Sequence, residues 1–338
     1  MDIGILFLSN KNMEDMGASD MELVMHDIRR VLEMHENDEL ISPGKVVLSW
    51  GKTLEDENTL GRINAMPGYV GGEYDMAGIK WIGSNPGNYK LGLPRASVTV
   101  ILNDPITKLP VCVADGTAVS AVRTGAVSGL AIDKLAKKDS RVMTIIGAGV
   151  QARTQLEAAL IARPAIDEVY INDVFMDRAE AYAIEMSEKH NISVIPTEDA
   201  RSAALKSDIL ITATIAAEPI VNTDWLAPGV LAINLADYEF TYDSVLHCDK
   251  IYVDTWEGVK NRKVSTVSLM FADGIIGDDA VTAELGAVLL GKKAGRESDE
   301  EIIYFNSVGM GCEDIAVVTR AYKNALKAGA GTKVAFWE

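Results

Sequence analysis

Cysteine and histidine are scarce in this chain of 338 residues. Its three cysteines, Cys112, Cys248 and Cys312, lie far apart and form no C-x-x-C pair. Their number and spacing argue against a disulfide framework and favour a reducing, cytoplasmic location. The four histidines are scattered too, and none has the spacing of metal ligands, so we expect no metal site. Zinc catalysis and a Cys–His nucleophile are therefore disfavoured.

Long apolar runs and an excess of basic residues are also absent. No hydrophobic stretch has the length needed to span a bilayer. The short apolar run after Met1 lacks a preceding basic segment, so we interpret it as a first strand and not as a signal peptide. The 32 basic and 49 acidic residues give a net charge of −17. Because such a chain repels phosphate backbones and anionic lipids, we expect neither nucleic acid nor a membrane as a partner.

The pattern of apolar residues changes along the chain, and the length suits two domains. The first part mixes a helix over 21–34 with strands over 45–50, 77–82 and 96–102, separated by Gly, Pro and Asn. From about residue 119, short apolar runs alternate with helical stretches. This β-α-β-α alternation predicts an α/β fold with a doubly wound parallel sheet. A last helix is predicted over 317–328.

The sharpest local motif is Gly147-Ala-Gly149-Val150-Gln151-Ala152, which joins a strand over 141–146 to a helix over 151–162. This is the G-x-G-x-x-A pattern of a dinucleotide-binding turn. Gly147 provides the tight turn, Gly149 the close approach to a pyrophosphate, and Ala152 the close packing of helix and strand. The N-terminus of the helix then binds the phosphates.

Two further strand ends are candidates for the same site. Asp173 lies 26 residues after Gly147, near the spacing expected for the acid that binds the ribose hydroxyls. An acid there repels a 2′-phosphate, so NAD is favoured over NADP. Asp173 can alternatively serve to start the following helix. Thr212 and Thr214 end the strand predicted over 209–214 and either line the nicotinamide side of the cleft or simply end that strand.

A series of motifs in a fixed order carries a resemblance to a known family. They are Arg62-Ile-Asn-Ala-Met-Pro67, Lys80-Trp-Ile-Gly-Ser-Asn-Pro-Gly-Asn88, Gly92-Leu-Pro94, Leu102-Asn-Asp-Pro-Ile-Thr107, Asp115-Gly-Thr117, Arg123-Thr-Gly-Ala126, the Gly147 turn, Phe305-Asn-Ser307-Val-Gly309 and Glu313-Asp-Ile-Ala316. Together they resemble the ornithine cyclodeaminase/μ-crystallin family from about residue 60 to 325. The resemblance implies a Rossmann domain over 121–316, and a discontinuous α+β domain for substrate binding and dimerisation over 1–120 and 317–338.

The resemblance also implies roles for individual residues. Arg62 and Arg123 would grip the substrate carboxylate, as guanidinium groups do bidentately. Lys80, which we expect at a strand end, and Asp237 would act as acid and base on the substrate nitrogen or on water. Without the resemblance, each of these charges reads as a surface group, and Asp237 as a turn cap. The cofactor would be held by the following residues: Arg123, Thr124, Gly147, Gly149, Val150, Gln151, Asp173, Thr212, Thr214 and Ser307.

The activity expected is that of an NAD-dependent oxidoreductase acting on the Cα–N bond of a small amino or imino acid. Two alternatives are an ornithine cyclodeaminase, a lyase that uses NAD catalytically, and a crystallin-like binding protein without turnover. The Asp237-Tyr-Glu-Phe sequence lacks the Pro-Gly-Lys turn usual in cyclodeaminases. Arg95 stands where many relatives have a small polar residue, so we hypothesise that it binds a second substrate carboxylate. A cofactor-phosphate contact or a surface position are the alternatives for Arg95.

Overall fold

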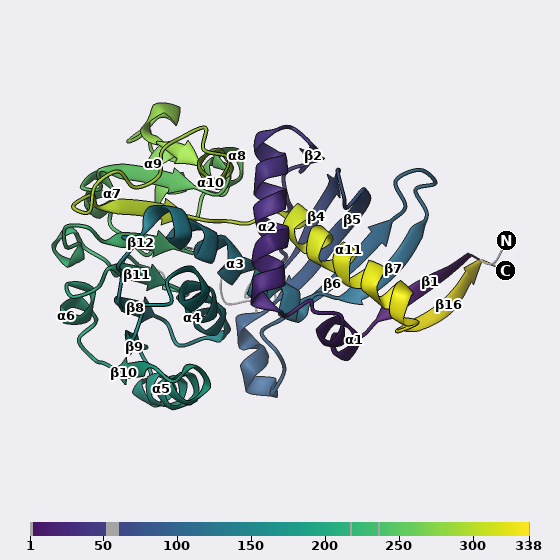
Figure 1. Cartoon of the computed structure of the whole chain (residues 1–338), viewed down its shortest axis with the longest axis horizontal. Coiled ribbons are helices and arrows are strands. Elements are labelled where there is room, and N and C mark those ends of the chain that lie inside the picture. Colours follow the sequence, from purple (N-terminus) through teal and green to yellow (C-terminus); the bar gives the residue numbers. More distant parts are fainter. Residues whose placement is uncertain (1–2, 52–60, 217, 236, 338) are drawn as a thin grey trace. The chain divides into compact units, whose positions relative to one another are not determined.

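The computed structural model describes residues 3–51, 61–216, 218–235 and 237–337. It divides into two compact units, Met1–Arg123 with Met310–Glu338 (unit 1) and Thr124–Gly309 (unit 2) (Figure 1). The chain therefore crosses between units at 123/124 and 309/310. The sequence placed these crossings at 120/121 and 316/317, and both of those positions fall inside helices.

Unit 1 is built on a mixed sheet with strand order β16-β1-β7-β6-β5-β4-β2, in which β3 also pairs with β4. The β1–β7 pair is parallel and the other pairs are antiparallel. The strands are β1 (Ile3–Leu8), β2 (Leu40–Ile41), β3 (Val46–Leu48), β4 (Arg62–Val70), β5 (Met76–Ser84), β6 (Ala96–Asn103), β7 (Pro110–Asp115) and β16 (Thr332–Trp337).

One face of this sheet is covered by helix α11 (Gly311–Ala328), which contacts β4, β5 and β6 (Figure 1). Helix α2 (Met21–Glu36) packs on α11, α1 (Asn10–Asp15) lies beside β1 and β7, and η2 (Pro86–Leu91) follows β5. Along β6 the side chains of Val98, Val100 and Leu102 are buried and alternate with more exposed ones. This alternation is the pattern of a sheet with one covered face.

Unit 2 is built on a parallel sheet with strand order β10-β9-β8-β11-β12-β15-β13-β14. The strands are β8 (Val142–Ile146), β9 (Glu168–Asn172), β10 (Ser193–Pro196), β11 (Ile209–Thr212), β12 (Leu231–Asn234), β13 (Lys250–Val253), β14 (Ala283–Glu284) and β15 (Ile303–Asn306). The strand order reverses between β8 and β11, and at such a switch point open parallel sheets bind their ligands.

Helices surround this parallel sheet, and Figure 1 shows α4 and α6 to either side of β8 and β11. They are α3 (Thr117–Leu135), α4 (Val150–Ala162), α5 (Met176–His190), α6 (Ala200–Ala204), α7 (Tyr242–Leu246), α8 (Trp256–Lys260), α9 (Thr266–Ala272) and α10 (Leu285–Leu289), with the short η3 (Thr223–Trp225) and η4 (Asp278–Ala280). The predicted α/β fold with a doubly wound parallel sheet is confirmed. Within the described ranges, no helix is both long and apolar enough to cross a membrane.

Candidate active site

The Gly147 turn connects the end of β8 to the start of α4. Gly147 adopts a φ of 102°, in the region that favours glycine. A Cβ there would lie 2.6 Å from the carbonyl oxygen of Ala213, which follows β11. Both observations require glycine at 147, because any side chain would meet backbone that cannot give way.

The N-terminus of α4 is open to a ligand. Gly149 is the residue that caps α4, and it has no side chain with which to accept a hydrogen bond from the first turn. A Cβ at Gly149 would meet nothing within 4 Å, and Val150 is exposed. The backbone N–H groups of the first helical turn therefore face space, with the positive end of the helix dipole behind them. Such a turn fits the pyrophosphate of a dinucleotide.

Gln151 and Asp173 flank this turn. The Gln151 side chain has a buried Oε1 for which the described residues provide no hydrogen-bond partner. Asp173 Oδ2 accepts a hydrogen bond from the Ala148 N–H at 2.8 Å, and its Oδ1 accepts one from the Phe175 N–H at 3.0 Å. Asp173 thus lies beside the Gly147 turn and also shapes the approach to α5.

The two threonines after β11 are held by a carboxylate that the sequence did not reveal. Glu239 is fully buried, and its Oε2 accepts a hydrogen bond from the Thr212 hydroxyl at 2.8 Å. Its Oε1 accepts from the backbone N–H and the hydroxyl of Thr214, at 2.7 and 2.6 Å. Burial raises the pKa of the Glu239 carboxyl, and these donors oppose that effect. Thr212 is itself buried, and β11 ends there, so Thr214 lies in the loop that follows the strand.

Asp237 and Ser307 follow the neighbouring strands β12 and β15. Asp237 Oδ1 lies 3.6 Å from Nη2 of Arg262, a second cation that the sequence did not single out. Ser307 is buried and donates its backbone N–H to the carbonyl of Asn234 at 3.4 Å. Just beyond it, Asp254 Oδ2 accepts the N–H groups of Val308 and Gly309 at 2.8 and 2.6 Å. This carboxylate fixes the turn through which the chain leaves unit 2.

Unit 1 contains a buried cluster of four charges. Lys80 Nζ in β5 lies 2.8 Å from Asp314 Oδ1 and donates to the Ser120 hydroxyl at 2.8 Å. Arg123 Nη1 lies 2.9 Å from Glu313 Oε2, and its Nε lies 3.4 Å from Asp314 Oδ2. The side chains of Lys80 and Asp314 are 1% and 0% exposed. Charges so deeply buried persist only when each has a partner of opposite sign.

Local structure explains how these groups meet. Glu313 and Asp314 lie in the first turn of α11, where the helix dipole favours acidic side chains. Ser120 and Arg123 are three residues apart near the start of α3, and residues with that spacing share a helix face. Asp115 Oδ1 accepts the Thr117 N–H at 2.9 Å, and α3 begins there.

Lys80 differs from its predicted position. It was expected at a strand end, but β5 spans Met76–Ser84, so Lys80 lies at its centre and pairs with Met66 of β4. Its side chain lies on the sheet face covered by α11, where Asp314 and Ser120 contact the amine. This burial lowers the pKa of Lys80 to about 8, while Asp314 acts in the opposite direction and Arg123 lowers it further. A lysine amine in this range can exchange protons near neutral pH.

Arg62 and Arg95 lie outside this cluster. Arg62 is the first residue of β4 and is exposed. It is four residues from Met66, the partner of Lys80, so it lies on the same sheet face about 13 Å along the strand. Arg95 is exposed in the loop before β6, and its carbonyl accepts the Asn85 N–H at 2.8 Å. The structure thus brings Lys80 and Arg123 together but places neither Arg62 nor Arg95 in contact with them.

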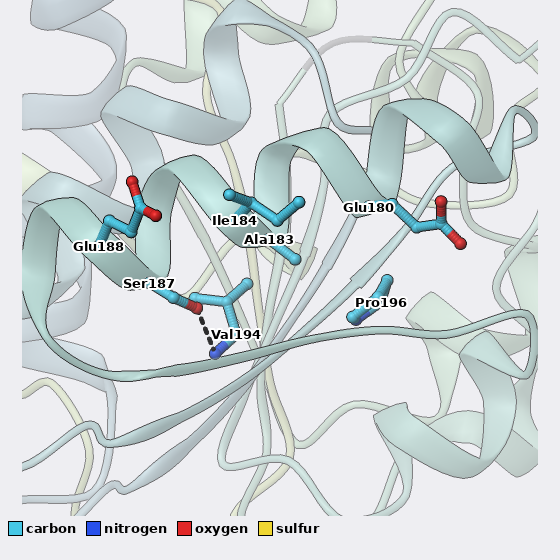
Figure 2. A pocket seen from close by; sticks show the side chains of 7 residues that line it. All are labelled: Glu180, Ala183, Ile184, Ser187, Glu188, Val194 and Pro196. Carbon is cyan, nitrogen blue, oxygen red and sulfur yellow. Dashed lines mark hydrogen bonds between the residues drawn. The ribbon is translucent and has the colours of Figure 1, made fainter.

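A surface groove of about 530 Å³ lies elsewhere, between α5 and β10 (Figure 2). Ile184 and Ala183 supply apolar surface there, and the Ser187 hydroxyl accepts the Val194 N–H at 3.1 Å. None of the predicted site residues lines this groove. In the described part of the chain, no group of three or more His, Cys, Asp or Glu side chains is arranged to hold a metal ion.

Several known proteins are similar to this chain in sequence and in fold. The chain is 33% identical over 330 residues to N-((2S)-2-amino-2-carboxyethyl)-L-glutamate dehydrogenase of Staphylococcus aureus, covering 97% of each chain. Its fold matches Δ1-pyrroline-2-carboxylate reductase of Thermococcus litoralis, solved with NADH and L-proline, with a TM-score of 0.90, 36% identity and coverage of 98% of this chain and 100% of that one. It also matches an archaeal alanine dehydrogenase dimer with bound NAD, with a TM-score of 0.88, 33% identity and coverage of 99% and 100%.

The family model that matches this sequence covers residues 16–329, which includes every residue predicted for the site. Together with the relatives above, this match confirms the resemblance inferred from the motifs. The chain belongs to the ornithine cyclodeaminase/mu-crystallin family.

Proposed function

We propose that this chain is an NAD-dependent oxidoreductase that moves a hydride to or from the α-carbon of a small amino or imino acid. The observation that carries the proposal is the buried Lys80 amine, with a pKa of about 8, held beside Arg123 by Asp314 and Ser120. Relatives that cover nearly the whole chain are named as dehydrogenases or reductases of amino or imino acids, and two of them were solved with NADH or NAD.

The cofactor would be held by unit 2. The bound nicotinamide would accept or donate the hydride. Gly147 permits the turn, Gly149 and Val150 present the open start of α4 to the pyrophosphate, and Asp173 lies where the ribose hydroxyls would bind. A carboxylate at that position favours NAD over NADP. The remaining residues assigned to the cofactor are Arg123, Thr124, Gln151, Thr212, Thr214 and Ser307.

The substrate would be held by unit 1. Arg123 and Arg62 offer guanidinium groups for the α-carboxylate. Asp314 and Ser120 fix the amine of Lys80. This amine would take a proton from the substrate ammonium before the hydride leaves Cα. Asp237 would hold or protonate the nitrogen as the imine is hydrolysed or formed, with Arg262 keeping its carboxylate oriented.

A panel of amino acids with NAD tests the proposal. Absorbance at 340 nm should rise for the true substrate, together with free ammonia when that substrate is a primary amino acid and without it when the substrate nitrogen is secondary. Ammonia without NADH would instead identify a cyclodeaminase, and neither signal with any substrate, in either direction, would favour a binding protein. Because the Staphylococcus aureus relative is named as a dehydrogenase of a glutamate derivative, the panel should contain dicarboxylic substrates. Comparison with Arg95→Ala then tests whether Arg95 raises affinity for these substrates selectively.

We further propose that the chain forms a homodimer through unit 1. The sheet face opposite α11 carries exposed apolar side chains, including Trp81 in β5, at 40% exposure, and Val46 in β3, which lies in the same cross-strand row. Contiguous apolar surface of this kind marks a protein interface. One structural neighbour is a dimer. The three cysteines are free, which suits a reducing cytoplasm.

A further inference from the structure

Glu239 is a buried charge of unit 2 to which the proposed chemistry gives no role. It lies two residues after Asp237, in the segment that joins β12 to α7, and its side chain is 0% exposed. An isolated carboxylate at such a place is costly, and chains avoid it unless donors surround the group. The surroundings of Glu239 therefore indicate what the residue does.

Four hydrogen bonds converge on this one carboxylate. Besides the three from Thr212 and Thr214, Asn234 Nδ2 donates to Glu239 Oε2 at 2.7 Å. An ionised carboxylate has about four acceptor positions, so these donors match its capacity. Two of the four are N–H groups, which can only donate. The site thus selects a carboxylate by its pattern of donors.

The same network reaches three neighbouring strands at their carboxyl ends. Thr212 ends β11, Asn234 ends β12, and Asn234 Oδ1 accepts the hydroxyl of Tyr304, in β15, at 2.7 Å. Asn306 Nδ2 donates to the Asn234 carbonyl at 2.7 Å. The carboxyl ends of parallel strands form the ligand-binding edge of such a sheet. Glu239 is therefore the centre of a rigid polar layer beneath that edge.

Thr214 connects this layer to the dinucleotide turn. A Cβ on Gly147 would lie 3.2 Å from Cγ2 of Thr214, so the loop held by Glu239 lies directly against the turn. The adjoining Ala213 N–H donates to Ile146 at the end of β8 at 2.8 Å. On its other side, the Glu239 N–H donates to the carbonyl of Asp237 at 3.0 Å. One side chain thus positions both the loop against the turn and the segment that carries Asp237.

We propose that Glu239 is a positioning residue for the dinucleotide, holding the loop after β11 and the Asp237 segment in the arrangement that receives the cofactor. This inference rests on the proposed function, because it concerns the NAD site of the same enzyme. Glu239 does not touch the cofactor; it acts through Thr214 and Asp237.

Glu239→Gln is the informative substitution because it keeps the size of the side chain. The amide has one acceptor oxygen and one NH2 group. In one orientation the NH2 faces the Thr214 N–H, and in the other it faces Asn234 Nδ2, whose Oδ1 already accepts from Tyr304. Each orientation places the NH2 group of the glutamine against another hydrogen-bond donor, so the loop after β11 must move. We expect the Kd of NAD, measured by calorimetric titration of the full chain, to rise about tenfold or more.

Asp208→Asn provides a matched control within the same sheet. Asp208 Oδ2 accepts the N–H groups of Arg141 and Val142 at 2.8 and 3.1 Å, at the opposite, amino-terminal edge of β8 and β11. Loss of the Asp208 carboxylate should lower the melting temperature of the protein and leave the Kd of NAD unchanged. A Kd raised equally in both variants would overturn the inference, because general destabilisation would then explain the effect.

Thr212→Val serves if Glu239→Gln fails to fold. It removes one donor to Glu239 from a fully buried position, and we expect a rise of several-fold in the Kd of NAD. Folded variants at 212 and 239 that bind NAD as tightly as the wild type would overturn the role of Glu239. A wild-type chain that does not bind NAD would instead refute the proposed function, so the two failures are distinguishable.

Discussion

The burial of the Lys80 side chain determines the proton affinity of its amine. Its amine is enclosed at the centre of β5, where a lone ammonium would be unstable, and Asp314 and Ser120 hold it. Desolvation lowers its pKa to about 8, from a usual value of 10.5. The neutral amine, the form that accepts a proton, therefore makes up half of the population near pH 8.

The pH profile of amino-acid oxidation should report this amine. Below pH 8 the amine of Lys80 is mostly protonated and cannot act as base, so kcat/KM should rise with pH and level off above about 8. Lys80→Met should reduce kcat by about 10²–10⁴-fold and abolish the rise of kcat/KM with pH. Steady-state rates between pH 6 and 10 provide the measurement.

Asp314→Asn supplies the matched comparison. The Asp314 charge raises the pKa of Lys80, so its removal should move the midpoint of the rising limb to lower pH. Arg123 and Glu313 also face Lys80, and both remain in this variant. A midpoint that moves upward, or stays in place in a folded and active variant, would argue that another group is the base.

At the scale of helices and strands, sequence patterns predicted some parts of the fold better than others. The parallel strands of unit 2 are short apolar runs between helical stretches, and β8 and β11 were predicted close to their observed bounds. By contrast, β4 was not predicted, because Pro67 and Gly68 interrupt a strand pattern. In the structure both residues stay in register with β5.

Sequence patterns likewise predicted the local parts of the candidate site but not the contacts between residues distant in sequence. The Gly147 turn was predictable because its chemistry is local, and Asp173 because its spacing from the turn is regular. The start of α11 was placed six residues too late, so its acidic first turn was taken for a motif and not for the partner of Lys80 and Arg123. The partners of Glu239 come from three different strands, so no local pattern indicates that this carboxylate is buried.

At the scale of the whole molecule, the exposed face of the unit 1 sheet predicts self-association. Trp81→Arg places a charge in the middle of that face and should convert a dimer to a monomer in size-exclusion chromatography with light scattering. Ile184→Arg is the control, because Ile184 is at least as exposed but lies in unit 2, on α5 (Figure 2). A wild-type chain that runs as a monomer at micromolar concentration, or a Trp81→Arg variant that stays dimeric, would contradict the proposed interface.

The central claim is that a hydride passes between the α-carbon of the substrate and NAD, and isotope transfer tests it most directly. The amino acid identified by the panel should be supplied with deuterium at Cα, and the reduced cofactor should be analysed by mass spectrometry. We predict one deuterium in each NADH formed and a matching loss from the substrate. Reduced cofactor without the label, or label lost to water, would contradict the account.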